Sequence, residues 1–154
     1  MDSSKNGLIP NALLAALPHD EYERLLPGLE EVAVKFGTNI YNSGDKIDHV
    51  YFLNSGIVSL LAAVDGLTLD IGMVGSEGMI GLSFFLGAKT TLGQAIVQGN
   101  GSAMRMKAAD LKNECGKNGT LPVLLMRYAR SMLAQLGQSS ACYNFHKKVP
   151  RLAR

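Results

Sequence analysis

Short turn signals recur along most of this chain, and they constrain its fold more than any other feature. The turn signals stand at residues 43–45, 54–56, 65–66, 75–76 and 99–101. Asp65-Gly66 is the strongest hairpin prediction, because a two-residue hairpin turn favours residues that tolerate a positive φ at both central positions. Most of these signals lie about 8 to 12 residues apart, a spacing typical of antiparallel sandwiches, jelly rolls and barrels.

The segments between the turns have the two-residue alternation of β-strands. The first runs from Glu31 to Phe36, where Val32, Val34 and Phe36 alternate with other residues until Gly37 ends the run. Further strands are predicted at Asn39–Tyr41, Val50–Leu53, Ile57–Val64, Leu67–Val74, Gln94–Gln98 and Ala103–Met106. The predicted fold class is therefore mainly β with flanking helices.

Helices are predicted on both sides of these strands. Residues 11–17 form one short helix, and a second is expected to be capped by Asp20 and to run to Leu26. A third helix spans residues 107–116. A longer helix begins near Thr120, whose side chain is expected to cap it, with Pro122 in the first turn.

The long helix carries a heptad seam, by which we mean the apolar stripe Leu125, Ala129, Met132, Leu136, Ser139 and Tyr143. One interpretation is that the seam packs against the chain's own β-structure, as most amphipathic helices do. The other is a homodimer whose two-fold axis follows the helix. Apolar residues off the seam, namely Leu124, Met126, Tyr128 and Leu133, favour the dimer, because they offer a second face to the β-structure.

Length and charge exclude several classes of protein. The chain has 154 residues and a formal charge of +2, consistent with one domain. Four basic residues lie within the last eight, so the rest of the chain has 11 basic and 13 acidic residues and lacks a basic face for nucleic acid. Neither a secretory signal nor an apolar membrane span is visible, and a cytoplasmic location without membrane contact is expected.

The sequence indicates neither a cofactor nor an enzyme. Two cysteines, Cys115 and Cys142, are too few for the four ligands of an iron–sulfur cluster. No histidine and carboxylate spacing suits a metal, which argues against a jelly-roll enzyme of cupin type, and we predict no catalytic residue. For Cys142, a redox disulfide to a second copy and a buried thiol both stay open, the buried thiol being favoured.

Residues 75–91 break the strand pattern, because they combine four glycines with several large apolar residues. One interpretation is a buried connection in which glycine permits tight turns and close packing. The other is a loop whose backbone N–H groups hold an anionic ligand at the start of a short helix. Glycine content does not separate the two.

The segment from Gly44 to Leu60, with the sequence GDKIDHVYFLNSGIVSL, resembles the hairpin of the cyclic-nucleotide-binding β-roll. Residues 70–75 and 78–82 resemble its next motifs, and the long helix resembles the dimerisation helix of Crp/Fnr-type bacterial regulators. The resemblance implies a double-stranded β-helix, or jelly roll. It divides the chain into short helices at 1–30, the β-roll at 31–118, the dimerisation helix at 119–148 and the start of a missing winged helix-turn-helix domain at 149–154.

The chain departs from this family at the cassette that binds the cyclic phosphate. Members that bind cyclic nucleotides have a glutamate after the glycine that Gly81 matches and an arginine near the position of Thr91 or Leu92, but here Leu82 follows Gly81 and Lys89 is the only nearby cation. The chain has neither the carboxylate that accepts from the ribose hydroxyl nor the arginine that binds the cyclic phosphate through two hydrogen bonds. Binding of cAMP and cGMP is therefore disfavoured.

The resemblance nevertheless predicts a ligand pocket next to the long helix, taking a less charged or apolar effector. The candidate ligand-binding residues are Gly81, Leu82, Ser83, Phe84, Thr90, Thr91, Gln135 and Gln138. We therefore predict the effector-sensing and dimerisation domain of a transcription regulator, which would reach DNA only through the missing domain. A stand-alone β-roll that binds a small molecule or docks to a partner is the alternative.

Overall fold

The computed structural model describes residues 9–91 and 93–135, and in this part of the chain eight strands form two antiparallel sheets. Sheet A has the strand order β1 (Glu30–Val34), β8 (Gly101–Lys107), β3 (His49–Leu53) and β6 (Met79–Ile80). Sheet B has the order β2 (Asn39–Tyr41), β7 (Gln94–Gly99), β4 (Ile57–Val64) and β5 (Leu67–Val74). The predicted fold class, a β-roll with flanking helices, is confirmed.

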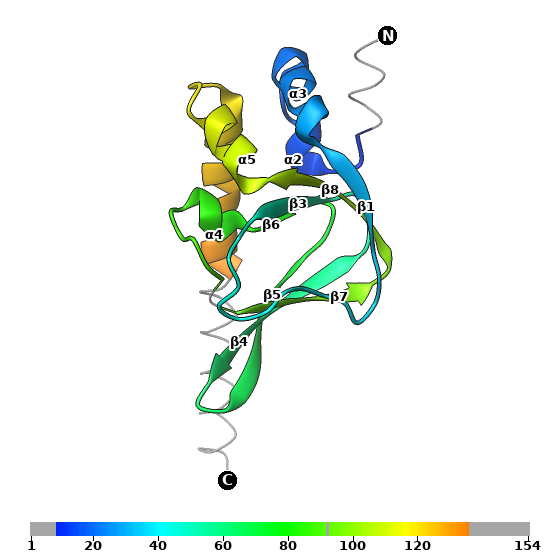
Figure 1. Cartoon of the computed structure of the whole chain (residues 1–154), viewed down its shortest axis with the longest axis vertical. Helices are drawn as coiled ribbons and strands as arrows, with labels where there is room; N and C mark the ends of the chain where they lie inside the picture. The colour runs from blue at the N-terminus through cyan, green and yellow to red at the C-terminus, as the bar shows by residue number, and fades with distance from the viewer. Residues whose placement is uncertain (1–8, 92, 136–154) are drawn as a thin grey trace, which may run out of the picture.

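The helices lie mainly on one side of the β-roll (Figure 1). They are α2 (Ala12–Ala15), α3 (His19–Leu25), the 3-10 turn η1 (Leu26–Gly28), α4 (Leu82–Phe85) and α5 (Ala108–Cys115). The last helix begins at residue 120 and is described to residue 135; we call it the C-terminal helix. Figure 1 shows α2, α3 and α5 beside sheet A, and the C-terminal helix descending past α4 toward the β4–β5 hairpin.

The β4–β5 hairpin forms as the sequence predicts. Asp65 and Gly66 have φ values of 51° and 78°, the left-handed conformation that a two-residue primed turn requires at both positions. The register between the two strands shifts once, between Leu60 and Leu61, where Ile71 of β5 is the extra residue of a bulge.

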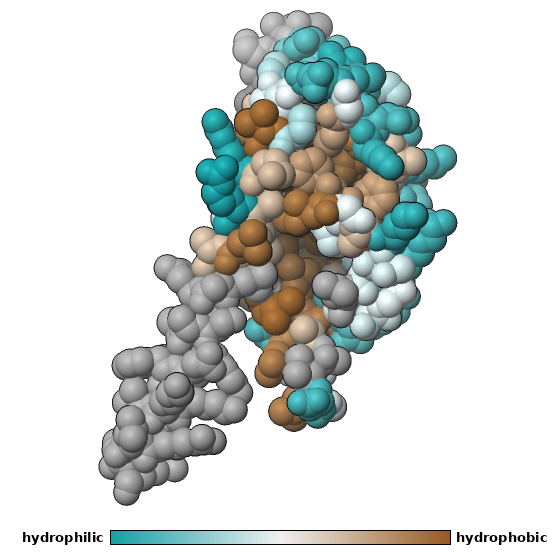
Figure 2. Space-filling model, turned by 90° about the vertical axis from the view of Figure 1, so that its left-hand side faces the viewer, coloured by the Kyte–Doolittle hydropathy of each residue, from teal (hydrophilic) through white to brown (hydrophobic). Residues whose placement is uncertain are grey.

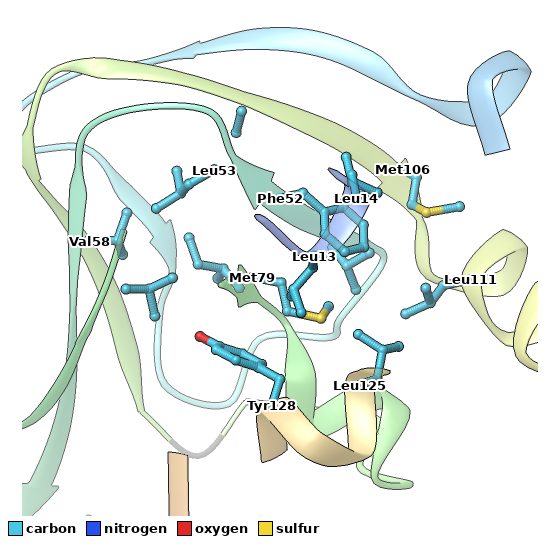
Figure 3. Packing of buried hydrophobic residues seen from close by; sticks show 14 of the residues in the cluster. Leu13, Leu14, Phe52, Leu53, Val58, Met79, Met106, Leu111, Leu125 and Tyr128 are labelled. Carbon is cyan, nitrogen blue, oxygen red and sulfur yellow. The ribbon is translucent and has the colours of Figure 1, made fainter. Parts of the chain in front are cut away.

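Part of the core lies between sheet A and the helices that cover it. Figure 3 shows Leu13 and Leu14 of α2 against Phe52 of β3, with Leu111 of α5 and Leu125 of the C-terminal helix nearby. Each of these five side chains is buried. Helices from both ends of the described chain therefore bury their apolar faces on the same sheet.

Asn11 joins α2 to sheet A through four hydrogen bonds and is fully buried. Its Oδ1 caps the helix by accepting from the N–H groups of Leu13 and Leu14, at 3.0 and 3.1 Å. Its Nδ2 donates to the carbonyls of Leu53 and Gly78, at 2.7 and 2.8 Å. These bonds use the whole capacity of the amide, so the buried polar group is satisfied.

Several predicted boundaries need correction. Asp20 does not cap the second helix; it lies within α3, and Pro18 takes the cap position. Phe36 lies beyond the end of β1 and is exposed. Strand β6 was not predicted, because its two residues are too few to show an alternation between the glycines on either side.

The start of the C-terminal helix was also predicted with the wrong cap. Thr120 is itself the first helical residue. The side chain that accepts from the first-turn N–H groups is Glu21 of α3, which is distant in sequence. The two residues are 99 positions apart in the sequence, so no local pattern predicts this contact.

Candidate functional site

A cavity of about 280 Å³ lies at the predicted ligand site, between sheet B, β6, α4 and the C-terminal helix. Sheet B contributes Tyr41, Leu60, Leu61, Ile71, Gln94 and Ala95. The segment from β6 to β7 contributes Met79, Ile80, Gly81, Leu82, Ser83, Leu86, Thr91 and Gly93, and the C-terminal helix contributes Ala129, Met132 and Leu133. The cavity therefore touches both the β-roll and the helix.

The cavity brings together some of the predicted ligand-binding residues and leaves others out. Gly81, Leu82, Ser83 and Thr91 line it, whereas the predicted Phe84, Thr90 and Gln135 do not. Phe84 packs against the hydrophobic core, while Thr90 pairs with Lys46 in an isolated bridge and is exposed. Gln135 is exposed on the helix, and Gln138 lies outside the described residues.

Gly81 holds the turn from β6 into α4 in the left-handed conformation, with a φ of 101°. A Cβ atom at this position would lie 2.8 Å from Val50 Cγ1 and 2.9 Å from the Tyr41 hydroxyl. Both the dihedral angle and the lack of space therefore require glycine. This turn directs the following residue, Leu82, into the cavity wall.

Two of the hydroxyl groups in the lining are already used by the fold. The Tyr41 hydroxyl donates to the carbonyl of His49, and burial raises the pKa of Tyr41 well above its ordinary value. The Thr91 hydroxyl donates to the carbonyl of Asn42 at 2.6 Å, and the Thr91 N–H donates to the carbonyl of Asp45 at 2.8 Å. These bonds fix the loop before β7 against the segment after β2.

Ser83 and Gln94 are the remaining polar side chains among the described residues of the lining, and none of these residues carries a charge. Lys46 and Lys89 are exposed and outside the lining. Lys46 pairs with Asp48 at 3.7 Å. An ionic ligand would be desolvated in this cavity without an opposite charge, which is costly, whereas an apolar ligand would not.

This geometry bears on the two interpretations of residues 75–91. The segment contains β6 and α4, and its last residues are hydrogen-bonded to residues 42–47. Its buried apolar side chains and the uncharged lining favour a buried connection over an anion-binding loop. Position 92, one of the two sites where a phosphate-binding arginine was expected, lies outside the described residues.

Sequence reasoning missed the cavity residues contributed by sheet B, such as Tyr41, Leu60 and Ala95. A motif search around Gly81 does not reach these strands. Their inward positions in the two-residue alternation were the only available signal, and that signal does not distinguish a packed interior from a hollow one.

The C-terminal helix buries part of the predicted dimer seam inside its own chain. Leu125 and Ala129 are only 0% and 5% exposed within the single chain, so the chain itself covers these two residues of the predicted interface. Met132 is half-buried and lines the cavity. Leu136, Ser139 and Tyr143 lie outside the described residues.

A different face of this helix is exposed and apolar. Val123, Met126 and Leu133 are 51%, 51% and 66% exposed, and they follow a spacing close to a heptad. We call these three residues the outer stripe. Figure 2, which views the side of the molecule with α4 and this helix, shows apolar side chains gathered in a band between hydrophilic margins.

Other possible chemistries find little support in the described part of the chain. Its histidine, cysteine and acidic side chains form no group of three or more that could hold a metal ion. Burial raises the pKa of the half-buried Cys115 thiol to about 11, and the Glu114 carboxylate adds to this, so the thiol is a weak nucleophile. None of the described helices is long and apolar enough to cross a membrane.

Several solved structures have a fold similar to that of this chain. The N-terminal domain of a transcriptional regulator from Streptomyces coelicolor A3(2) matches with a TM-score of 0.61 and 21% identity, over 87% of this chain and 94% of that one. The catabolite activator protein of Thermus thermophilus matches with a TM-score of 0.65 and 17% identity, over 89% and 63%. The regulatory subunit of a cAMP-independent protein kinase A from Trypanosoma brucei gives a TM-score of 0.72 and 15% identity, over 92% and 52%.

These identities are low, so the structural matches show the fold alone. A search of curated proteins gave no match. The sequence profile of the cyclic nucleotide-binding domain family, in contrast, matches residues 31–118, which is more than half of the chain. This chain therefore belongs to the cyclic nucleotide-binding domain family.

Proposed function

We propose that this chain is the effector-sensing and dimerisation domain of a transcription regulator, and that its effector is an uncharged, largely apolar small molecule. Catalysis has no place in this proposal. The likeness to a Streptomyces transcriptional regulator domain and to a catabolite activator protein supports the regulatory role. DNA recognition would belong to a separate winged helix-turn-helix domain of the regulator.

One observation carries the choice of effector: the cavity at the cassette position has no charged side chain in its described lining. A cyclic phosphate needs a cation, most often a bidentate arginine, and its ribose needs an acceptor. Leu82 lines the cavity at the position where that acceptor is expected. The kinase regulatory subunit of Trypanosoma brucei, which is described as cAMP-independent, is a precedent for this fold without a cAMP response.

The cavity also supports a route for the signal. Its walls come from the β6–β7 segment on one side and from Ala129, Met132 and Leu133 of the C-terminal helix on the other. A ligand that touches both walls has a different affinity for each position of the helix, and this difference is what an effector needs to shift a conformational equilibrium.

Binding of Nile red, an uncharged apolar dye, tests the effector class. Fluorescence titration of the wild-type chain should show saturable binding, and cAMP and cGMP should neither displace the dye nor raise the melting temperature. Leu82→Glu should weaken dye binding at least about tenfold, because it places a carboxylate in an uncharged wall.

Lys89→Glu is the matched control, since it adds the same side chain outside the lining and should leave dye binding unchanged. Micromolar or tighter binding of either cyclic nucleotide by the wild-type chain would contradict the proposal. Equal dye affinity in the wild type and Leu82→Glu would show that the dye binds elsewhere and would remove the support for this cavity.

For dimerisation, we propose that the outer stripe replaces the seam at the interface between two copies. The three residues of the stripe are the exposed large apolar side chains of the described helix. Met126→Glu should convert a dimer to a folded monomer in sedimentation velocity, whereas Phe36→Glu, at an exposed apolar residue elsewhere, should stay dimeric. A wild-type monomer would instead favour the stand-alone β-roll module.

A further inference from the structure

The C-terminal helix starts without a cap of its own. Gly119, the residue before the first helical position, has no side chain, and Pro122 in the first turn has no N–H group. The free N–H groups of Thr120 and Leu121 would need an acceptor from elsewhere, because helix-starting amides lack intrahelical partners.

Glu21 of α3 supplies that acceptor. Its Oε1 accepts from the Thr120 N–H at 2.6 Å and from the Leu121 N–H at 3.4 Å. The residue is only 5% exposed, so its carboxylate is held inside the protein at the positive end of the helix dipole.

Gly119 and Glu21 are fitted to each other. A Cβ atom on Gly119 would lie 1.9 Å from Glu21 Oε1, so any larger residue would collide with the carboxylate. The usual capping residues, serine and aspartate, therefore fit at position 119 only if the Glu21 side chain moves away from the start of the helix. The cap comes from α3 at a place where a local cap does not fit.

Helix α3 is also fixed to α5. Arg24 donates from Nε to Glu114 Oε2 at 3.0 Å, its Nη2 forms an ion pair with the same oxygen at 2.9 Å, and Glu114 is buried. Lys117 approaches the other carboxylate oxygen, Oε1, at 3.4 Å. Helix α3 thus holds α5 through its arginine and the C-terminal helix through its glutamate.

We propose that Glu21 is a positioning residue that fixes the start of the C-terminal helix to α3 and makes that point the pivot of the helix. Displacement of the helix then occurs beyond its first turn, where Ala129, Met132 and Leu133 face the cavity. The proposal does not depend on what the cavity binds, because the pivot exists in the chain alone.

The test separates capping from positioning with two variants. Glu21→Ala removes both, whereas Glu21→Ala/Gly119→Asp restores a cap within the helix itself, since the space left by the carboxylate admits an aspartate. Amide hydrogen exchange of residues 120–125 reports the cap. Positioning is reported by the distance distribution between spin labels at Glu31→Cys on β1 and Arg127→Cys on the helix, both exposed sites, with the native cysteines replaced by serine.

In Glu21→Ala we expect the first-turn amides to exchange about tenfold faster and the distance distribution to broaden. In the double variant the exchange rate should return to that of the wild type while the distribution stays broad. Labelled chains are diluted with unlabelled chains so that only distances within one chain contribute. Glu23→Ala, at an exposed site on the same helix, is the control and should change neither reading.

Two results would overturn the proposal. Unchanged first-turn exchange in Glu21→Ala would show that the carboxylate is not the cap, and a narrow distribution in the double variant would show that it does not position the helix. If Glu21→Ala fails to fold, Glu21→Gln takes its place. It should speed exchange of the first-turn amides alone by about threefold, and unchanged exchange there would equally refute the proposal.

Discussion

The two sheets of the β-roll are built from strands of similar pattern but enclose different interiors. Against sheet A, helices α2 and α5 and the start of the C-terminal helix fill the space with buried side chains, and the polar amide of Asn11 is fully hydrogen-bonded. Against sheet B, a cavity of about 280 Å³ remains, and its described lining is uncharged. If the proposed function holds, the filled side of the roll maintains the fold while the cavity side binds the effector.

The largest expected effect of a mutation lies on the packed side, at Asn11. Asn11→Ala removes a helix cap and leaves the carbonyls of Leu53 and Gly78 without donors, so unfolding in guanidinium chloride should show a loss of about 3 kcal/mol. Asn113→Ala, at an exposed helical site, should change stability by less than about 0.5 kcal/mol. A similar stability for both variants would mean that the buried network does not fix α2.

The same substitution on the two sides tests the comparison directly. Ala103→Val on β8 adds two methyl groups to a filled interior and should cost about 2 kcal/mol. Ala95→Val on β7 adds them to the cavity wall, where stability should hold or rise by about 0.5 kcal/mol while Nile red binding weakens. Equal destabilisation by both, measured by thermal and chemical unfolding, would show that the cavity is filled in solution.

The smallest effect is expected from alkaline pH, again on the packed side. Burial raises the pKa of Cys115 from its ordinary value of 9.0 to about 11, so the unfolded chain loses this proton first as the pH rises. Stability contributed by the neutral thiol is complete below pH 9 and is lost between about pH 9 and 11, by at most about 1 kcal/mol because the residue is only half-buried.

Chemical unfolding of the wild type and Cys115→Ser at pH 8, 10 and 11 measures this contribution. The difference in unfolding free energy between the two proteins should shrink as the pH rises. A constant difference would show that Cys115 titrates alike in the folded and unfolded chains.

Strands were predictable where alternation extended over enough residues. Leu67–Val74 has the predicted bounds, because an eight-residue alternation beside an Asp-Gly turn is a strong local signal. Met79–Ile80 is a strand only through pairing with Tyr51 and Phe52, which no local pattern records. A strand could therefore be predicted where its own residues showed the two-residue alternation.

The buried face of the C-terminal helix and the residue that caps it could not be predicted from the sequence. Leu125 and Met126 are adjacent and both apolar, yet one is buried and the other exposed, because the position of the sheet determines which side is covered. Likewise, Glu21 accepts a hydrogen bond from the Thr120 N–H, although the two residues are 99 positions apart in the sequence. The predicted residues Gly81, Leu82 and Ser83, in contrast, do line the cavity, because a glycine turn next to a short helix is a local feature.

The turn at Gly81 also limits which residues can be varied to change the proposed ligand. Val50 and Tyr41 close the space beside this residue, so the position accepts no other side chain without moving a strand. The next position, Leu82, faces the cavity and carries no backbone requirement of this kind. Mutant libraries for altered specificity should therefore keep Gly81 and vary Leu82 together with Ser83 and Gln94. The backbone turn then stays the same while the side chains that line the cavity change.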